Sequence, residues 1–240
     1  MTDVEADMIR RLITTVIVIA GVSVVAGMQS GSLPVPVDHL VYGTPDLGMG
    51  IERIEKLLGL RATPGGQHPG RGTRNALVSL GTSTYLEIIG PDPDQPTPAQ
   101  PRPFGVDTLK EPRLVTWAAK GKDLDRLAGE AGRRGVKLGE VIPGSRKRPD
   151  GGILSWRYTD PRTVVAGGVV PFFIDWGTSM HPSATATQGA SLVGLRAEHP
   201  QPDQVRKMLD GFGLDLAVAM GPRPALVATV SGPRGRVELR

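Results

Sequence analysis

The chain has 240 residues, of which 39% are apolar and 22% are charged, and it contains no cysteine. These proportions are ordinary for a globular protein with a sizeable core, and the missing cysteines exclude disulfides, thiolate metal sites and a cysteine nucleophile. The net charge of +4 is small for this length. Without a long basic stripe interleaved with aromatic residues we expect no nucleic-acid partner, and the basic run Arg146-Lys147-Arg148 is interpreted as a solvated loop.

Residues 1–34 form an N-terminal apolar segment and linker, in which residues 12–28 carry no charge. Several interpretations stay open. The segment is a signal peptide, for which a start at Met8 gives a suitable basic region, or a membrane anchor that brings residues 12–28 into membrane contact. It is otherwise a core helix or an artefact of start-site choice, with translation beginning at Met28 rather than Met1. Export or anchoring follows from the first two interpretations, and a cytoplasmic location from the artefact.

The first structured stretch begins with a strand over residues 37–42. Alternation places one set of side chains (Val37, His39, Val41) on one face and the other set (Asp38, Leu40, Tyr42) on the opposite face. Thr44-Pro45-Asp46 then opens a helix that Gly59 ends. A Gly- and Pro-rich loop is predicted over residues 63–73. Two strands follow it, over residues 75–80 and 85–89.

The same order of elements recurs twice along the chain. The second occurrence has a strand over 114–119, a helix over 123–134 and strands over 153–159 and 169–176. After a polar connector over 178–188, the third has a strand over 192–197, a helix over 202–209 and strands over 216–220, 225–230 and 236–239.

We therefore predict an α+β domain over residues 35–240, made of repeated βαβββ modules that form a curved mixed sheet around a cleft. The units cover about 35–91, 114–177 and 191–240. Pairing of two such units buries their edges and apolar faces. The third unit pairs across an edge or with another copy of the chain, which would give a homodimer.

Several motifs, taken in order, resemble the glyoxalase-like domain of the vicinal oxygen chelate superfamily. They are DHLVY at 38–42, TPDL at 44–47, PGGQHPGRGTRNAL at 64–77, YLEIIGP at 85–91, PFFIDWG at 171–177 and HP at 181–182. The resemblance implies paired modules around a cleft that often holds a divalent metal, with ligands from the first and last strand of each module. Activities in this superfamily include isomerases, dioxygenases, epimerases, thiol transferases and pure binding proteins.

His39 and Glu87 match the first-strand and last-strand ligand positions of the first module. An imidazole nitrogen and a carboxylate oxygen suit Zn, Mn, Fe or Ni, and Glu87 is also a candidate general base. A His39–Glu87 hydrogen bond without a metal is the alternative. The second module departs from the pattern, because its first strand has no histidine, and only Asp175 or His181 can be nominated as a third ligand.

Three residues in or beside the Gly-rich loop, His68, Arg74 and Asn75, are predicted to contact a substrate. The three tryptophans are interpreted as core residues or as lining of the cleft. Two functions stay open for a small organic partner. One is a metal-dependent lyase, isomerase or dioxygenase in which the metal acts as a Lewis acid, and the other is a metal-free binding protein that sequesters its ligand in the same cleft.

Overall fold

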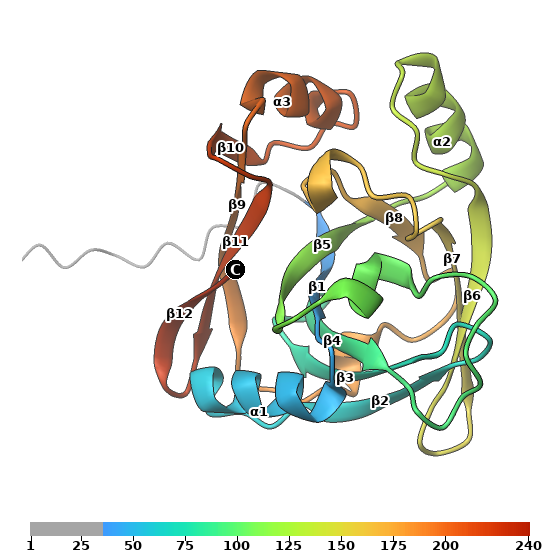
Figure 1. The fold of residues 1–240 in the computed structure, drawn as a ribbon, viewed down its shortest axis with the longest axis vertical. Coiled ribbons are helices and arrows are strands. Elements are labelled where there is room, and N and C mark those ends of the chain that lie inside the picture. The colour runs from blue at the N-terminus through green and yellow to red at the C-terminus, as the bar shows by residue number, and fades with distance from the viewer. Residues whose placement is uncertain (1–35) are drawn as a thin grey trace, which may run out of the picture. The chain divides into compact units, whose positions relative to one another are not determined.

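The computed structural model describes residues 36–240, which belong to the compact unit Leu33–Arg240 (Figure 1). The interpretations of the N-terminal segment fall on residues outside this range. Among the described residues, no helix has the length and apolar character needed to cross a membrane. The predicted fold class is confirmed, because three strand–helix–strands units follow one another and two of them form one curved mixed sheet.

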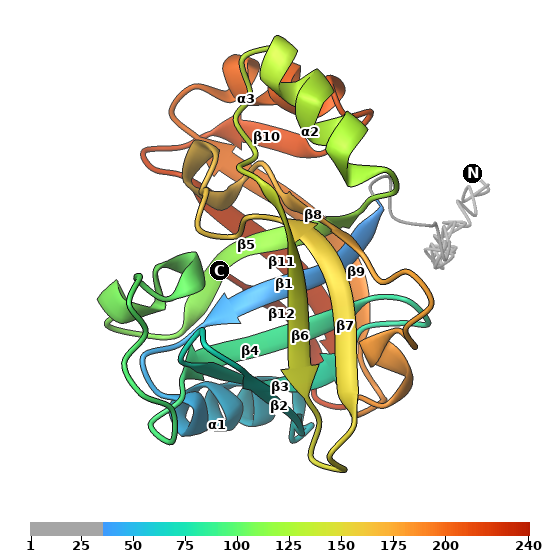
Figure 2. The same cartoon turned by 90° about the vertical axis from the view of Figure 1, so that its right-hand side faces the viewer.

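The first two units are βαβββ modules that share a closed barrel (Figure 2). The first module comprises β1 (Val37–Gly43), α1 (Leu47–Leu58), β2 (Thr63–His68), β3 (Thr73–Ser79) and β4 (Tyr85–Pro91). The second comprises β5 (Arg113–Lys120), α2 (Leu124–Arg133), β6 (Val141–Lys147), β7 (Ile153–Thr159) and β8 (Phe172–Asp175). Around the barrel the order is β1-β4-β3-β2-β6-β7-β8-β5, so each module contributes four consecutive strands.

Short 3-10 turns lie between the strands: η1 (Pro103–Thr108), η2 (Ala166–Gly168) and η3 (Pro182–Ala184). Helix α1 begins where predicted, because the Asp46 side chain accepts the N–H of Met49 at 2.9 Å, and it ends at Gly59 in the left-handed conformation. Its buried face, with Ile54 and Leu58, packs on the outside of the barrel.

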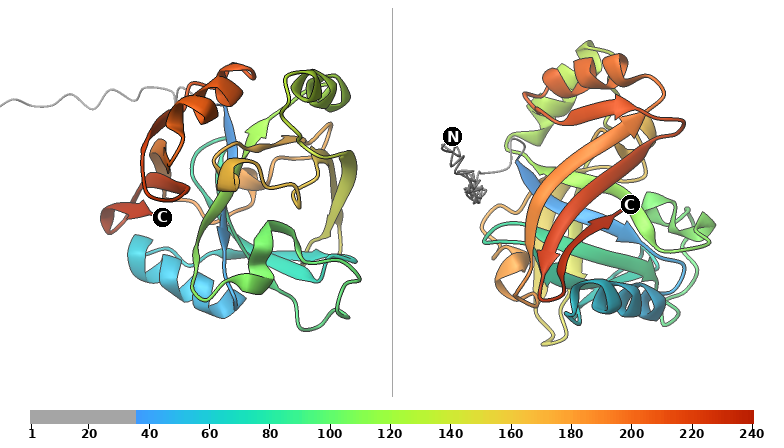
Figure 3. Two further views of the ribbon diagram at one scale, coloured as in Figure 1. Left: turned by 45° about the horizontal axis from the view of Figure 1, so that its top comes forward. Right: turned by 90° about the vertical axis from the view of Figure 1, so that its left-hand side faces the viewer.

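The third unit forms a separate sheet that packs on the outside of the barrel of its own chain (Figure 3). It comprises β9 (Ser191–His199), α3 (Pro202–Asp210), β10 (Ala217–Met220), β11 (Ala225–Gly232) and β12 (Gly235–Leu239). Its strand order is β10-β9-β11-β12, whereas the order within the first module is β1-β4-β3-β2. The third unit therefore repeats the order of elements along the chain but not the strand pairing of the barrel modules.

One continuous apolar core joins the outer face of the barrel to the third sheet. It contains Leu40 and Trp117 from the barrel together with Leu195, Leu226 and Val230 from the third sheet, all of them buried. A smaller core fills part of the barrel interior. The third sheet therefore covers one side of the barrel wall, and the barrel interior holds the candidate site.

Two predicted loops are strands in the structure. The Gly- and Pro-rich stretch predicted as a loop over residues 63–73 contains β2, and the basic run predicted as a solvated loop ends β6. Neither strand has the apolar alternation that predicts a strand from sequence. Each forms because it is hydrogen-bonded to a stronger neighbour: β2 to β3, and β6 to β7.

The side-chain directions predicted for β1 are wrong at the start of the strand, because the strand contains a bulge. Val37 lies opposite Ala119 and His39 lies opposite Ala118, so Asp38 is the additional residue. Val37 consequently joins the outer core with Leu40 and Tyr42. Beyond the bulge the predicted alternation holds.

Candidate functional site

The barrel interior holds a cavity with about 470 Å³ of empty space, part of which is open to solvent. One part of its lining is aromatic and the other is polar. The aromatic part consists of Tyr85, Phe104, Trp156, Tyr158, Phe172 and Trp176. The polar part consists of His39, His68, Arg71, Thr73, Asn75, Glu87 and Arg146. Such a combination of apolar walls with a few convergent polar groups is typical of a small-molecule site.

His39 of β1 and Glu87 of β4 lie side by side in this lining. Their side chains are 4% and 8% exposed, and the His39 Nε2 and Glu87 Oε2 atoms are 3.7 Å apart. The His39 ring stacks on Tyr85 with centroids 4.6 Å apart and contacts Phe172 by its edge. Strands β1 and β4 are neighbouring parallel strands, and this pairing brings the two residues together.

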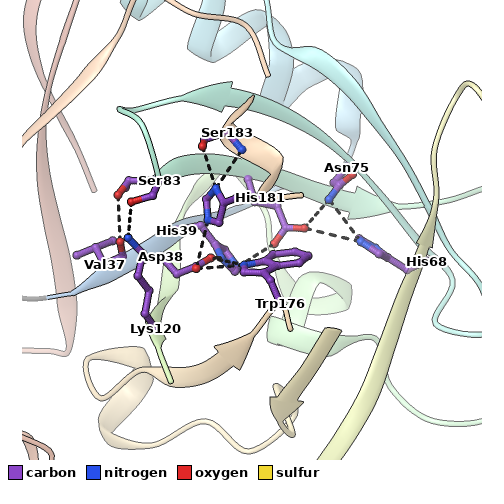
Figure 4. Close-up of polar contacts among 12 residues, drawn as sticks. Val37, Asp38, His39, His68, Asn75, Ser83, Lys120, Trp176, His181 and Ser183 are labelled. Carbon is purple, nitrogen blue, oxygen red and sulfur yellow. Dashed lines mark hydrogen bonds and ion pairs between the residues drawn. The ribbon is translucent and has the colours of Figure 1, made fainter. Parts of the chain in front are cut away.

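Asp38 fixes the orientation of the His39 ring. Its Oδ1 lies 2.8 Å from His39 Nδ1, and its carboxylate also accepts the Trp176 indole N–H and contacts His181 Nε2 at 3.3 Å (Figure 4). Burial alone raises the pKa of Asp38, but the hydrogen bonds from His181 and His39 lower it more, so the pKa lies well below its usual range. An ionised Asp38 requires the proton of His39 on Nδ1, which leaves Nε2 directed toward Glu87.

Asn75 of β3 holds Oε1, the second carboxylate oxygen of Glu87. Its amide nitrogen donates to Glu87 Oε1 at 2.6 Å and lies 3.4 Å from His68 Nε2, while its oxygen accepts from Arg146 Nη1 at 3.2 Å. His68 Nδ1 pairs with Thr73 Oγ1 at 2.9 Å. Burial lowers the pKa of His68 to about 4, with Arg146 and Arg71 acting in the same direction against Glu87. His68 is therefore neutral near pH 7.

The structure brings together some of the sequence-predicted site residues and separates others. His39, Glu87, His68 and Asn75 all line the cavity. Arg74 does not, because alternation along β3 turns it away from the side of Asn75, and it pairs with Asp94 at 3.5 Å.

The two candidates for a third metal ligand have other contacts. Asp175 accepts the backbone N–H of Gly177 at 2.9 Å and contacts none of the polar groups of the cavity. His181 contacts Asp38 and Ser183, so it supports the site from behind His39.

Sequence reasoning missed Arg71, Arg146 and Asp38 as parts of this site. Arg146 was assigned to a solvated loop, but it is 4% exposed and lines the cavity from β6. The period of two along β6 would have indicated an inward residue between exposed neighbours, had β6 been recognised as a strand. Asp38 could not be assigned from alternation, because the bulge turns it toward the site.

The residues present do not complete a metal centre. His39 and Glu87 are adjacent donors, but the second module faces the cavity with Phe172 and Ile174, and Ala118 lies opposite His39. Across residues 36–240, no three His, Asp or Glu side chains are grouped so that they could hold a metal ion. A catalytic metal commonly has three protein ligands. His68 is a further donor in the lining, with its Nε2 3.8 Å from Glu87 Oε1, but the Asn75 amide nitrogen contacts both of these atoms, so only His39 and Glu87 are left as ligands.

The chain is similar to known proteins in its family model and in its fold. A family model described as a glyoxalase-like domain matches residues 37–213. No curated protein sequence matches the chain. A solved structure of a hypothetical protein from Staphylococcus aureus is 15% identical with a TM-score of 0.58, and the match covers 84% of this chain and 83% of that one. That likeness shows that the fold recurs over most of both chains.

Solved structures of methylmalonyl-CoA epimerases are also similar to this chain, over a smaller part of it. The enzyme from Mycobacterium tuberculosis is 20% identical with a TM-score of 0.38, and the match covers 60% of this chain and 90% of that one. The enzyme from Streptomyces coelicolor, in complex with 2-nitronate-propionyl-CoA, is 19% identical with a TM-score of 0.39, covering 62% and 98%. The family model spans well over half of the chain, and so the chain belongs to the glyoxalase-like domain family.

Proposed function

We propose that the barrel cavity is the active site of an enzyme that moves a proton on a small carbonyl compound, in an isomerase or lyase reaction. The observation that carries this proposal is the His39–Glu87 pair. Its two atoms, 3.7 Å apart, face each other in a buried aromatic cavity. The far side of each group is held, His39 by Asp38 and Glu87 by Asn75.

The geometry supports a defined division of roles. Glu87 Oε2 takes the proton from a carbon next to a carbonyl group, and the C–H electron pair moves into the carbonyl to give an enolate. His39, with its Nδ1 proton held on Asp38, takes this proton from Glu87 on Nε2 and returns it to the enolate. Reprotonation at a different face or carbon gives the isomer, and departure of a group from the next carbon gives the lyase product.

A metal ion enters no step of this proposal, because the described donors fall short of a three-ligand set. The alternative enzyme, with Zn, Mn, Fe or Ni as Lewis acid, needs a third ligand from outside the pair. The alternative non-enzyme binds a ligand in the cavity without turnover, and the lack of donors in the second module favours it over the metal enzyme.

The test uses deuterium exchange, because it detects proton abstraction without knowledge of the product. The purified chain is incubated in D2O with a panel of small 2-oxo acids, 2-methyl acyl thioesters and their amides, and the loss of the C–H signal is followed by proton NMR. We expect exchange with at least one member. Glu87→Gln and His39→Gln should each slow it by about 10²–10⁴-fold, whereas His199→Gln, at the end of β9, should leave it unchanged.

Two results contradict the proposal. Folded wild-type protein that exchanges no member of the panel would exclude the carbon-acid reaction, and ligand binding without exchange would favour the sequestering function. Elemental analysis that finds one metal per chain, lost in Glu87→Gln and required for exchange, would favour the Lewis-acid mechanism.

A further inference from the structure

Two arginines in the cavity lining have no carboxylate partner. Arg146 is 4% exposed, and its Nε has no hydrogen-bond partner among the described residues. Arg71 is half-buried, and its Nη1 also has no partner. Within residues 36–240 neither guanidinium forms an ion pair within 4.0 Å. Arg71 donates from Nη2 to the Pro143 carbonyl oxygen at 3.3 Å and lies over the Tyr158 ring at 5.2 Å. An unpaired charge away from water is costly, so two such arginines facing one cavity need an explanation.

Two other described arginines show the ordinary arrangement. The Nε atoms of Arg74 and Arg148 also lack a hydrogen bond, but both side chains form ion pairs, Arg74 with Asp92 and Asp94 and Arg148 with Asp150. Neither of them lines the cavity. Among the described arginines that have a buried nitrogen without a hydrogen bond, only the two that face the cavity form no ion pair.

The charges of the lining leave room for one negative charge. Among the side chains that line the cavity, Arg71 and Arg146 supply two positive charges and Glu87 one negative charge, while burial keeps His68 neutral near pH 7. The ionised Asp38 lies outside this lining, where His39, His181 and the Trp176 indole N–H contact its carboxylate. A monoanion balances this sum, whereas a phosphate dianion would over-compensate it. Carboxylate oxygens also suit guanidinium N–H groups in geometry.

We propose that Arg146 and Arg71 form a carboxylate-binding subsite, so that the ligand of this cavity is a small carboxylic acid with an apolar or aromatic body. Arg146 is joined to Glu87 through Asn75, which accepts from Arg146 and donates to Glu87. A carboxylate bound by Arg146 therefore lies beside the His39–Glu87 pair, and its apolar body lies against the aromatic part of the lining. The inference rests on the proposed function only in naming this carboxylate as the substrate.

Binding is measured by isothermal titration calorimetry with three probes of matched shape: phenylacetate, phenylacetamide and phenyl phosphate. We expect phenylacetate to bind at least tenfold more tightly than phenylacetamide. Arg146→Gln and Arg71→Gln should each remove most of this preference. Arg74→Gln is the matched control, because Arg74 is close in sequence and pairs with Asp94 outside the cavity, and it should keep the wild-type preference.

A second measurement covers the chance that a variant is poorly folded. Removal of an unpaired buried charge should leave the melting temperature of free Arg146→Gln equal to or above that of the wild type. Equal affinity for phenylacetate and phenylacetamide, or an unchanged preference in folded Arg146→Gln and Arg71→Gln, would overturn the inference. Tighter binding of phenyl phosphate would assign the subsite to a phosphate ester instead of a carboxylate.

The two proposals fail in distinguishable ways. Selective binding of phenylacetate without deuterium exchange on any acid would leave the carboxylate subsite standing and remove the proton-transfer function. Exchange on thioesters or amides alone, with no dependence on Arg146, would do the reverse.

Discussion

At the scale of single residues, His68 links burial to the pH dependence of stability. Its pKa is lowered from 6.5 to about 4, first by burial. Between these pH values the unfolded chain binds a proton that the folded chain does not. The free energy of unfolding should therefore fall by roughly 3 kcal/mol as the pH falls from 7 to 4 through this group alone.

Urea unfolding at pH 7.0, 5.5 and 4.5 checks this prediction. In His68→Gln the free energy of unfolding should fall clearly less over this pH range than it does in the wild type. The control is His199→Gln, whose Nδ1 lies 3.0 Å from the Gln201 N–H at the end of β9, away from the cavity. An equally steep fall in His68→Gln would assign the effect to other groups. Asp38, whose pKa is lowered, also stabilises the folded chain, and this contribution to the free energy of unfolding is lost only at more acidic pH.

The sequence predicted some site residues and missed others for a clear physical reason. His39 and Glu87 are predicted because they match the ligand positions of the first module in the family that the sequence resembles, and because both lie in mid-strand beside apolar residues. Arg74 is predicted as a substrate contact because it lies beside the Gly-rich stretch, and only the register of β3 shows that it turns away from the side of Asn75. Contacts such as Arg146–Asn75 join residues 71 positions apart, which no local pattern contains.

At the scale of elements, the seam between the two modules depends on Gly66 in β2. Gly66 has φ +136°, and a Cβ atom there would lie 1.9 Å from the Lys147 carbonyl oxygen of β6. Strands β2 and β6 are joined through the Gln67–Lys147 pair. We expect Gly66→Ala to destabilise the protein by at least 2–3 kcal/mol, because it adds backbone strain and forces the two strands apart.

Gly70→Ala is the control for this substitution. Gly70 also has a positive φ, +70°, but nothing lies within 4 Å of a Cβ placed there. Its cost should be near 1 kcal/mol, the strain of the left-handed conformation alone. Equal midpoints in urea for the two variants would mean that the contact with Lys147 is not important to the barrel.

The same seam is where prediction of elements failed. Strands β1, β3, β4, β5 and β7 have the apolar alternation or apolar runs that sequence analysis detects. Strands β2 and β6 are rich in Gly, Pro and basic residues, and they depend on neighbours for their pairing. The two weak strands meet each other, so the closure of the barrel was the least predictable part of the fold.

At the scale of the whole molecule, the barrel and the third sheet share one core and should unfold together. Leu226 of β11 is 3% exposed and belongs to this shared core. Leu226→Ala should cost about 2–5 kcal/mol. All three tryptophans lie in the second module or directly after it, so their fluorescence reports on the barrel.

Thermal unfolding of Leu226→Ala, followed by tryptophan fluorescence and by far-ultraviolet circular dichroism, should show one coincident transition at a lower temperature. Met220→Ala, at a position 72% exposed in the same sheet, should change the midpoint little. A circular-dichroism transition that precedes the fluorescence transition would show that the third sheet unfolds by itself.

The repeat of elements was visible in the sequence, and the place of the third unit was not. The order strand–helix–strands is local, but the pairing β10-β9-β11-β12 and the packing on the barrel depend on contacts across the chain. A second copy of the chain was one predicted partner for this unit. In the structure the unit packs on its own barrel.

The bulge at Asp38 has a consequence for how relatives of this chain should be compared. The additional residue turns Asp38 toward His39 and moves Val37 to the outer core. A relative that keeps the histidine but lacks one residue before it would direct its aspartate, if it has one, away from the ring. In a sequence alignment, loss of the Asp38–His39 contact would then show only as a one-residue gap before the histidine. Two proteins with the same residues at all other site positions would differ in whether an aspartate holds the histidine ring.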